Sequence, residues 1–352
     1  MNKRLLFIIP IFPKSIDEDT IVPFIFQFCT FFQKKYPLVK IDVLTLEYPK
    51  HKKEYNINGI RVFTLKKSFK GKIGGFLQLL NAIKKGILLQ NKYKYIGVLS
   101  FWYSKPAIIG HILKKIFKLN HYTWLQGQDI KPHNKYLKRF PPKEKELISL
   151  GFQQQQQLFV YHKIFVKKIA NVAVDPNILP KLNIKNRDID IIGVGNLGPI
   201  KNYTKFIDIV FELKKIYPNI NTLICGDGEE KSSLQKKINE LKLSDNIKLY
   251  GYVSNIDVRN LMNNSKIFLH TSIFEGNPFV IQEALFSGCN VASTIDISFD
   301  TNIEIENFYF NEDINILASK INSVLSNNKQ ETKRVMPFDI NNTAKTIYDS
   351  FF

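Results

Sequence analysis

Two glutamates beside a predicted helix start are the residues of this sequence best suited to chemistry. Glu275 and Glu283 lie eight positions apart, and Pro278 between them is well placed as the first residue of a helix. Free amides at such a start can bind a diphosphate, and Glu283 would follow about 7 to 8 Å along the helix axis. Carboxylates repel phosphate but accept hydrogen bonds from sugar hydroxyls, so a nucleoside diphosphate sugar fits between them. Alternatively, Glu275 is a loop acid and Glu283 an exposed helix residue.

A glycine-rich run offers a second place for a phosphate. Residues Gly193 to Gly198 spell G-x-G-x-x-G after a predicted strand, a pattern typical of dinucleotide binding. The next candidate acid, Asp227, comes 29 positions after Gly198, whereas a ribose-binding acid is expected after roughly 20. A nicotinamide dehydrogenase is therefore a poor fit. The glycines still allow a phosphate to approach the backbone, and Lys201 can supply a positive charge.

Alternating strands and helices must position these residues. In the first half, the hydrophobic pattern predicts strands at Leu5 to Ile9, Ile41 to Leu46, Val62 to Leu65, Tyr95 to Ser100 and Tyr122 to Leu125, and helices at Val22 to Lys35, Phe76 to Gln90 and Ala107 to Phe117. In the second half, it predicts strands at Ile189 to Val194, Asn221 to Cys225, Ile247 to Leu249, Ile267 to His270 and Asn290 to Ser293, and helices at Tyr203 to Ile216, Glu230 to Leu241, Asp257 to Met262, Pro278 to Phe286 and Ile314 to Ser326. This alternation indicates an α/β protein with two doubly wound, Rossmann-like domains facing across a cleft.

The domain bounds follow from breaks in this pattern. We expect an N-terminal domain over 1–183, a C-terminal domain over 184–332, and a last helix within 333–352 that could return to the first domain. Prolines and asparagines near 175–186 indicate the linker. The glutamine run at 153–157 is interpreted as an exposed helix face.

The charge is concentrated in the first half of the chain. Residues 1–183 carry 32 basic and 10 acidic side chains, a net of +22, whereas residues 184–352 carry 18 and 21, a net of −3. Basic residues alternate with aromatic ones, as in the run Lys66-Lys67-Ser68-Phe69-Lys70. Such a surface suits nucleic acid or an anionic membrane leaflet, and composition alone does not choose between them. Residues 76–89 could form an interfacial helix or an ordinary amphipathic helix packed on a sheet.

The remaining composition limits the compartment. Three cysteines without metal-type spacing make a disulfide framework and a Cys-based zinc site unexpected and favour the cytoplasm. The apolar start is interrupted by Pro10 and Pro13 and is interpreted as a buried strand instead of a signal peptide. No segment reaches the ~18 uninterrupted apolar residues of a membrane-spanning helix. His133 and His162 show no partner in the sequence, and His270 at a strand end is interpreted as a structural donor.

From about Ile189 to Ser293 the chain resembles the carboxyl-terminal domain of the GT-B retaining glycosyltransferases of family 4, the glycosyl transferases group 1. The matching stretches are Val194-Gly195-Asn196-Leu197 with Lys201, Ile224-Cys225-Gly226-Asp227-Gly228-Glu229, Gly251-Tyr252-Val253, and Phe274-Glu275-Gly276 through Glu283-Ala284-Leu285 to Ser287-Gly288. The resemblance implies that Glu275 contacts the donor sugar, Glu283 the ribose and Lys201 the diphosphate. The family's arginine position is Asn196 here, which removes one charge. We expect the donor-binding residues to be Gly195, Asn196, Lys201, Gly226, Glu275, Gly276, Asn277, Phe279 and Glu283.

The first half resembles the family at one segment. Trp124-Leu125-Gln126-Gly127-Gln128-Asp129 is similar to its strand-end His-Gly-x-Asp segment, with Gln126 in place of histidine. A carboxamide can bind a sugar hydroxyl but cannot carry a proton. The glycine pair that usually follows the first strand is absent, and Asp17 and Asp19 lie there instead. We expect Asp17, Asp19 and Asp129 on the acceptor side, although the first two could belong to a solvated loop.

These observations predict a metal-independent retaining glycosyltransferase with Glu275, Lys201 and Gln126 as its catalytic residues. By resemblance it needs no cofactor beyond the nucleoside diphosphate sugar. The basic half suits a lipid-linked glycan acceptor in surface polysaccharide or lipopolysaccharide synthesis, so we expect a cytoplasmic protein docked peripherally on the inner membrane. A GT-B sugar-nucleotide epimerase would share fold and donor. A nucleic-acid-binding protein would use the same basic half, but no recognised nucleic-acid motif is present.

Overall fold

The computed structural model describes residues 3–18, 21–50, 54–65, 71–178, 181–182, 187–275, 277–297, 305–327 and 333–352, with Lys72 described by its backbone alone. Residue contacts divide the chain into two compact units, Met1–Asp175 with Phe338–Phe352, and Pro176–Pro337. The first unit thus ends eight residues before the predicted boundary at 183, and residues 333–337 lie in the second unit. The last helix belongs to the first unit.

The first unit is built on one sheet with the strand order β3-β4-β2-β1-β5-β6-β7-β8. Its strands are β1 (Lys3–Ile11), β2 (Val39–Tyr48), β3 (Glu54–Ile57), β4 (Ile60–Thr64), β5 (Gly97–Phe101), β6 (Asn120–Trp124), β7 (Leu147–Ser149) and β8 (Lys168–Ile169). The β3–β4 pair is antiparallel and the other pairs are parallel. A parallel sheet is buried on both faces, which explains why β1 and β5 read as continuous apolar runs.

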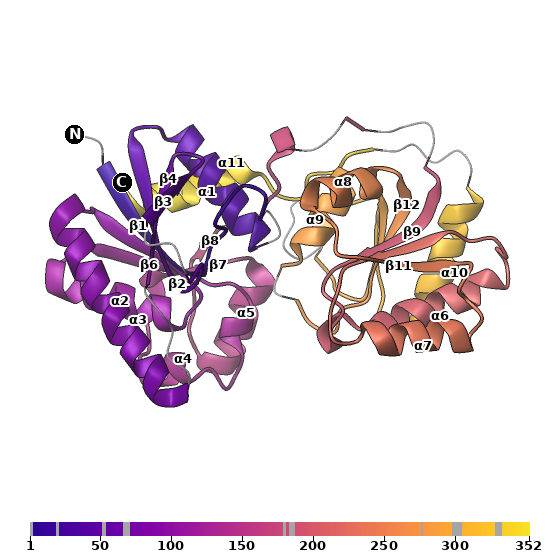
Figure 1. Cartoon of the computed structure of the whole chain (residues 1–352), viewed down its shortest axis with the longest axis horizontal. Coiled ribbons are helices and arrows are strands. Elements are labelled where there is room, and N and C mark those ends of the chain that lie inside the picture. The colour runs from indigo at the N-terminus through magenta and orange to yellow at the C-terminus, as the bar shows by residue number, and fades with distance from the viewer. Residues whose placement is uncertain are drawn as a thin grey trace. The chain divides into compact units, whose positions relative to one another are not determined.

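Helices cover this sheet (Figure 1). They are α1 (Pro23–Lys35), α2 (Gly71–Tyr93), α3 (Lys105–Phe117), α4 (Lys135–Arg139), α5 (Phe152–His162) and α11 (Ile340–Phe351). Helix α1 begins at a proline and buries Ile25, Phe28, Cys29 and Phe32, the 3.6-residue spacing of one helix face. Lys118, in the left-handed conformation, ends α3.

The second unit has a fully parallel sheet with the order β11-β10-β9-β12-β13-β14. Its elements are the strands β9 (Ile189–Val194), β10 (Thr222–Cys225), β11 (Ile247–Gly251), β12 (Ser265–His270), β13 (Asn290–Ser293) and β14 (Phe308–Phe310), and the helices α6 (Tyr203–Lys214), α7 (Lys231–Glu240), α8 (Asn255–Asn263), α9 (Phe279–Phe286) and α10 (Ile314–Ser326). Ile191 packs with apolar residues of α6, α7 and α10, and its neighbour Ile192 with those of α8 and α9. The helices therefore form one layer on each face (Figure 1).

Each strand and helix predicted from periodicity is present, with ends displaced by no more than five residues. The interpretation of the glutamine run is wrong in part. Gln154 and Gln155 on α5 are buried: Leu150 N donates to Gln154 Oε1 over 2.8 Å, and Gln155 Nε2 donates to Val166 O over 2.6 Å. Their amides satisfy backbone groups that would otherwise be buried without partners.

Two further expectations concern cysteines and membrane helices. Cys29, Cys225 and Cys289 are all buried free thiols. Within the described ranges, no helix is both long enough and apolar enough to cross a bilayer.

Candidate active site

The second sheet brings Lys201 and Glu275 together although they are 74 residues apart. Strands β9 and β12 are parallel neighbours, so the loops after their carboxyl ends lie side by side. Lys201 ends the short 3-10 helix η4 (Pro199–Lys201), and its Nζ lies 2.5 Å from Glu275 Oε1. The two loops are joined by Ile273 N donating to Ile200 O and by Thr271 Oγ1 donating to Lys201 O. Backbone contacts between the two loops thus hold together two residues that the sequence analysis singled out without predicting an ion pair between them.

The carboxylate of Glu275 is stabilised in its ionised form. Burial alone would raise its pKa, but the hydrogen bond of His270 and the charge of Lys201 outweigh burial and hold the pKa at about 2. Ser272 Oγ donates to Glu275 Oε1 over 3.1 Å and lies 3.1 Å from His270 Nε2. Burial lowers the pKa of His270, which favours a neutral imidazole. Glu275 can therefore accept hydrogen bonds near neutral pH but cannot donate a proton.

His270 serves the network from within the sheet. Its Nδ1 lies 3.2 Å from Ser293 Oγ on the neighbouring strand β13, and its Nε2 faces Ser272 and Glu275. The side chain is 3% exposed. These contacts fit the structural role that the sequence suggested for His270. Ser272, which the sequence analysis did not single out, completes the link to Glu275.

Glycines let two loops beside Lys201 approach each other. Gly195 N donates to Cys225 O, and Gly226 adopts a φ of +149°. A Cβ on Gly226 would lie 1.8 Å from Gly195 O, and one on Gly228 would lie 2.4 Å from the carbonyl oxygen of Leu197. The glycines thus allow the chain to pack against itself, which is a role the sequence analysis did not assign. The predicted approach of a phosphate to them stays a prediction.

The loop after Glu275 leads into α9, as predicted. Pro278 is the N-cap and Phe279 the first helical residue, buried to 9% exposure. Gln282 Nε2 donates to Asn277 Oδ1 over 2.7 Å, so the side chain of Asn277 turns toward the helix. Gly276, expected to bind the donor, lies outside the described residues. The exposed side chain of Asn196 occupies the position of the family's arginine.

Glu283 is a buried member of an ion pair, which overturns the alternative of an exposed helix residue. Its Oε1 lies 3.2 Å from Nε of Arg259 on α8, and the two residues are 6% and 7% exposed. The sequence analysis missed Arg259. Arg259 shares the buried face of α8 with Val258 and Met262, and the burial of that face is seen only in the structure.

The candidate residues of the first unit lie in loops after its strands. Gln126 Nε2 donates to Trp124 O, while its Oε1 is buried without a hydrogen-bond partner among the described residues. Asp129 is buried, and its two oxygens accept the amides of Tyr103 and Gln126 at 2.6 and 3.0 Å. Burial raises the pKa of Asp129 to about 6 despite these bonds. The carboxylate organises the loop that carries Gln126, and the direct acceptor contact expected of Asp129 stays a prediction.

The other acids of the first unit remain untested. Asp17 is exposed in the loop after β1, and Asp19 lies outside the described residues. Nearby, Glu18 forms an ion pair with Lys14 and accepts a hydrogen bond from the hydroxyl of Tyr48. The structure neither joins Asp17 to another candidate residue nor contradicts a role in acceptor binding.

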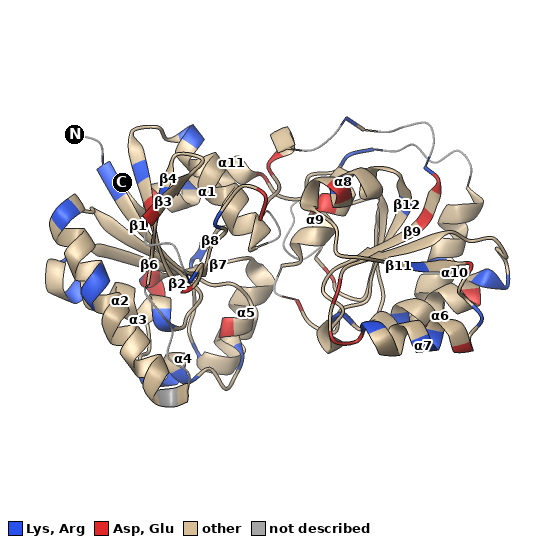
Figure 2. Ribbon diagram, viewed as in Figure 1, with Lys and Arg blue, Asp and Glu red and all other residues tan. Residues whose placement is uncertain are grey.

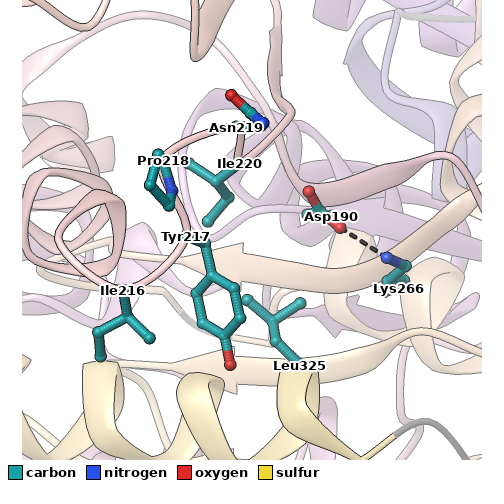
Figure 3. Close-up of a pocket in the computed structure, with 8 residues that line it drawn as sticks. All are labelled: Asp190, Ile216, Tyr217, Pro218, Asn219, Ile220, Lys266 and Leu325. Carbon is teal, nitrogen blue, oxygen red and sulfur yellow. Dashed lines mark hydrogen bonds and ion pairs between the residues drawn. The ribbon is translucent and has the colours of Figure 1, made fainter.

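A separate pocket lies at the amino ends of β9 and β12 (Figure 3). Asp190 and Lys266, an ion pair at 2.7 Å, line it together with Tyr217 and neighbouring apolar residues. The loops of Lys201 and Glu275 leave the opposite, carboxyl ends of the same strands. The pocket is therefore not part of the candidate site. Across the described part of the chain, no group of three or more His, Cys, Asp or Glu side chains is arranged to hold a metal ion.

Comparison with known proteins finds a sequence match for the second unit. Residues 174–336 match the family model described as glycosyl transferases group 1. An uncharacterized glycosyltransferase of Methanocaldococcus jannaschii is 26% identical over 208 residues, which cover 52% of this chain and 51% of that protein. The alpha-monoglucosyldiacylglycerol synthase of Acholeplasma laidlawii is 31% identical over 124 residues, 35% of this chain and 31% of that protein. The matches thus span about half or less of these relatives.

Comparison with solved structures covers nearly the whole chain. The Anabaena protein HepE in complex with UDP and glucose has a TM-score of 0.71, with 16% identity, over 98% of this chain and 98% of that chain. Identity this low shows the fold alone. It confirms the predicted GT-B fold, with two Rossmann-like units.

Proposed function

We propose that this chain, whose residues 174–336 match the family model of the glycosyl transferases group 1, is a retaining glycosyltransferase that uses a nucleoside diphosphate sugar. The observation that carries the proposal is the Lys201–Glu275 pair at the carboxyl ends of β9 and β12. In this proposal Lys201 is the cation for the diphosphate, and Glu275 beside it is the carboxylate for the sugar. The start of α9 at Phe279, four residues after Glu275, adds the positive end of a helix dipole.

The difficult step is departure of the nucleoside diphosphate while positive charge develops on the sugar ring. Lys201 would stabilise the leaving diphosphate, an electrostatic contribution of about 3 to 4 kcal/mol per donor. With Asn196 at the family's arginine position, Lys201 is the single cation in the segments 195–201 and 271–278. Glu275, ionised near neutral pH, would hold sugar hydroxyls, and the amide of Gln126 would bind a hydroxyl of a substrate. The acceptor enters on the face that the diphosphate leaves, and the phosphate takes its proton.

Ligand binding and turnover test this assignment. UDP-, GDP- and ADP-sugars would be screened for thermal stabilisation, because a ligand of the native state raises its stability. We expect Glu283→Ala mainly to weaken nucleotide binding and Lys201→Ala mainly to slow transfer. Product analysis with and without acceptor separates transfer from epimerisation. Equal and negligible effects of both substitutions would contradict these roles.

We infer that the acceptor is a lipid-linked glycan, of the kind used for surface polysaccharide or lipopolysaccharide. Support comes from the name of a relative, alpha-monoglucosyldiacylglycerol synthase, and from the charge of the first unit. From Tyr55 to Gln128 the sequence has 13 Lys or Arg and no Asp or Glu. Figure 2 shows Lys and Arg but no Asp or Glu on α2 and α3. Each such cation near an anionic leaflet contributes about 1 kcal/mol.

Helix α2 presents an apolar row within this basic region. Ile73, Phe76 and Leu80 are 78%, 60% and 46% exposed, and their spacing places them on one helix face. Gln78 and Ala82 on another face are buried against the unit. Lys66, Lys67 and Lys70, which precede α2, lie outside the described residues. We propose that this row, named the α2 row, inserts into the anionic inner face of the cytoplasmic membrane.

Vesicle flotation tests the α2 row. Phosphatidylcholine vesicles with and without phosphatidylglycerol would be mixed with the wild type and with Ile73→Ser/Phe76→Ser/Leu80→Ser. Because each buried large apolar side chain contributes about 1.5 to 3 kcal/mol, we expect binding to anionic vesicles to fall at least about tenfold. Ile256→Ser/Ile316→Ser, at exposed apolar positions of the second unit, is the control and should bind like the wild type. Equal binding by all three proteins would contradict insertion.

A further inference from the structure

The pair of Arg259 and Glu283 is unusual for its surroundings. Glu283 is the single charged side chain of α9, whose other buried residues are apolar except Gln282. Arg259 is the single cation of α8, and both residues face the interior between the two helices. Removing two charges from water costs several kcal/mol per ion, and a buried pair is often no more stable than apolar residues of the same volume. Packing alone therefore gives little reason for this pair.

The guanidinium of Arg259 should change how easily the carboxyl group of Glu283 ionises. Burial favours the neutral form of a carboxyl group, and an adjacent guanidinium favours the ionised form. An ionised carboxylate only accepts hydrogen bonds, whereas a protonated one donates through its hydroxyl group. The vicinal hydroxyls of a ribose are two donors that an ionised carboxylate can accept together. The guanidinium also fixes the carboxylate, since Arg259 Nε and Glu283 Oε1 are 3.2 Å apart.

We propose that Arg259 is a positioning residue of the donor site, which keeps Glu283 ionised and oriented to accept the hydroxyls of the donor's ribose. The proposal rests on the proposed function, because it requires that Glu283 binds a nucleotide. Arg259 itself need not touch the donor. Its effect reaches the ligand through Glu283, so it should alter ribose recognition more than the binding of the rest of the nucleotide.

Discrimination between ribose and deoxyribose tests this role. Calorimetry would be run with UDP, GDP and ADP, and then with the 2′-deoxy and 3′-deoxy forms of whichever the wild type binds most tightly. We expect the wild type to prefer the ribonucleotide at least about tenfold, because hydrogen bonds to charged groups are among the stronger ones. In Arg259→Met this preference should fall below about threefold, mainly through weaker ribonucleotide binding. Arg259→Lys should restore part of it and provides a test if the Met variant does not fold.

A matched control separates positioning from stability. Arg187 is also partly buried in the second unit, but its guanidinium donates to the carbonyl oxygens of Ser265, Ser287 and Gly288. Arg187→Met should lower the melting temperature and leave the ribose preference unchanged. In a Glu283→Gln background the preference should already be lost, and Arg259→Met should change it no further.

The outcomes distinguish this inference from the proposed function. If Arg259→Met folds and keeps the wild-type preference, Arg259 is structural and the inference is wrong. If the wild type binds a nucleotide but does not prefer it to its deoxy forms, Glu283 does not bind the ribose hydroxyls. The inference then fails, while donor binding stands. If the wild type binds none of the three nucleotides, the proposed function fails and the inference fails with it.

Discussion

Replacing Glu275 by glutamine should tighten the binding of UDP while it slows sugar transfer. The ammonium group of Lys201 is paired with the carboxylate of Glu275 at 2.5 Å. A diphosphate must compete with that carboxylate for the ammonium group and is repelled by it. Glu275→Gln keeps the size of the side chain and removes the charge, so Lys201 becomes available to the phosphate.

The expected gain follows from the electrostatics of the pair. A pKa of about 2 for Glu275, in place of 4.5, corresponds to about 3 kcal/mol of net stabilisation of the carboxylate. His270 contributes part of this, burial opposes it, and side chains exposed by nearly a quarter are partly screened by water. We assign about 1.4 kcal/mol to the competition with a diphosphate, which is tenfold in the dissociation constant.

Isothermal titration with UDP at pH 7.5 and low salt measures this effect. The Glu275→Gln variant should bind UDP about tenfold more tightly, and the difference should shrink as salt screens the charges. Glu240→Gln, which removes the same charge from an exposed position on α7, is the control and should change affinity less than about twofold. Transfer by Glu275→Gln should fall at least about a hundredfold, as for loss of one strong transition-state contact. Unchanged or weaker UDP binding would refute the competition.

Three further outcomes are expected. The pKa of Asp129 in the folded protein is about 6 against an ordinary 3.8, so its contribution to stability is present at low pH and is lost as the pH rises through 6. Urea unfolding of the wild type and of Asp129→Asn at pH 4.5 and pH 7 should show the wild type gaining about 2 kcal/mol relative to the variant at the lower pH. A difference that stays constant with pH would contradict this. Gly226→Ala should lower the free energy of unfolding in urea by about 3 kcal/mol or more, because its Cβ would clash with Gly195 O. Gly59→Ala is the control: Gly59 also has a positive φ, but its Cβ would point into open space, so this substitution should cost only about 1 to 2 kcal/mol. Transfer activity should survive EDTA, since we propose metal independence, and its loss with recovery on adding Mg²⁺ or Mn²⁺ would overturn that part of the proposal.

Most helices and strands could be predicted because their apolar residues recur at regular spacing over five or more residues, or form continuous buried runs. Helix α1, with its phenylalanines at helical spacing behind Pro23, and the buried strand β1 were both identified from apolar residues alone. The short strands β3, β7, β8 and β14 were missed: β7, β8 and β14 have only two or three residues, and β3, in which Glu54 and Asn56 are exposed, has no apolar run. The burial of Gln154 and Gln155 was also missed, since the need for their amides arises only when β7 and residue Val166 are brought beside α5.

The candidate site was predictable in its members and less so in its contacts. The resemblance singled out Lys201 and Glu275, but only the pairing of β9 with β12 puts them in contact. Glu283 was singled out without its partner, because a pattern read along one helix does not reveal a charge contributed by another. The sequence context of Asp129 gives no sign that its two oxygens accept backbone amides, and its assignment to the acceptor side stays a prediction.

Because of helix α11, the second unit can complete its fold earlier during synthesis than the first. It packs on the first unit: Tyr348 stacks on Tyr36 with ring centroids 4.2 Å apart, and Thr343 Oγ1 donates to Asn171 O. The ribosome releases α11 only after every residue of the second unit, so the second unit can fold while the first still lacks a helix of its outer layer. A nascent chain arrested before Ile340 would leave the aromatic surface around Tyr36 uncovered, a natural target for a chaperone.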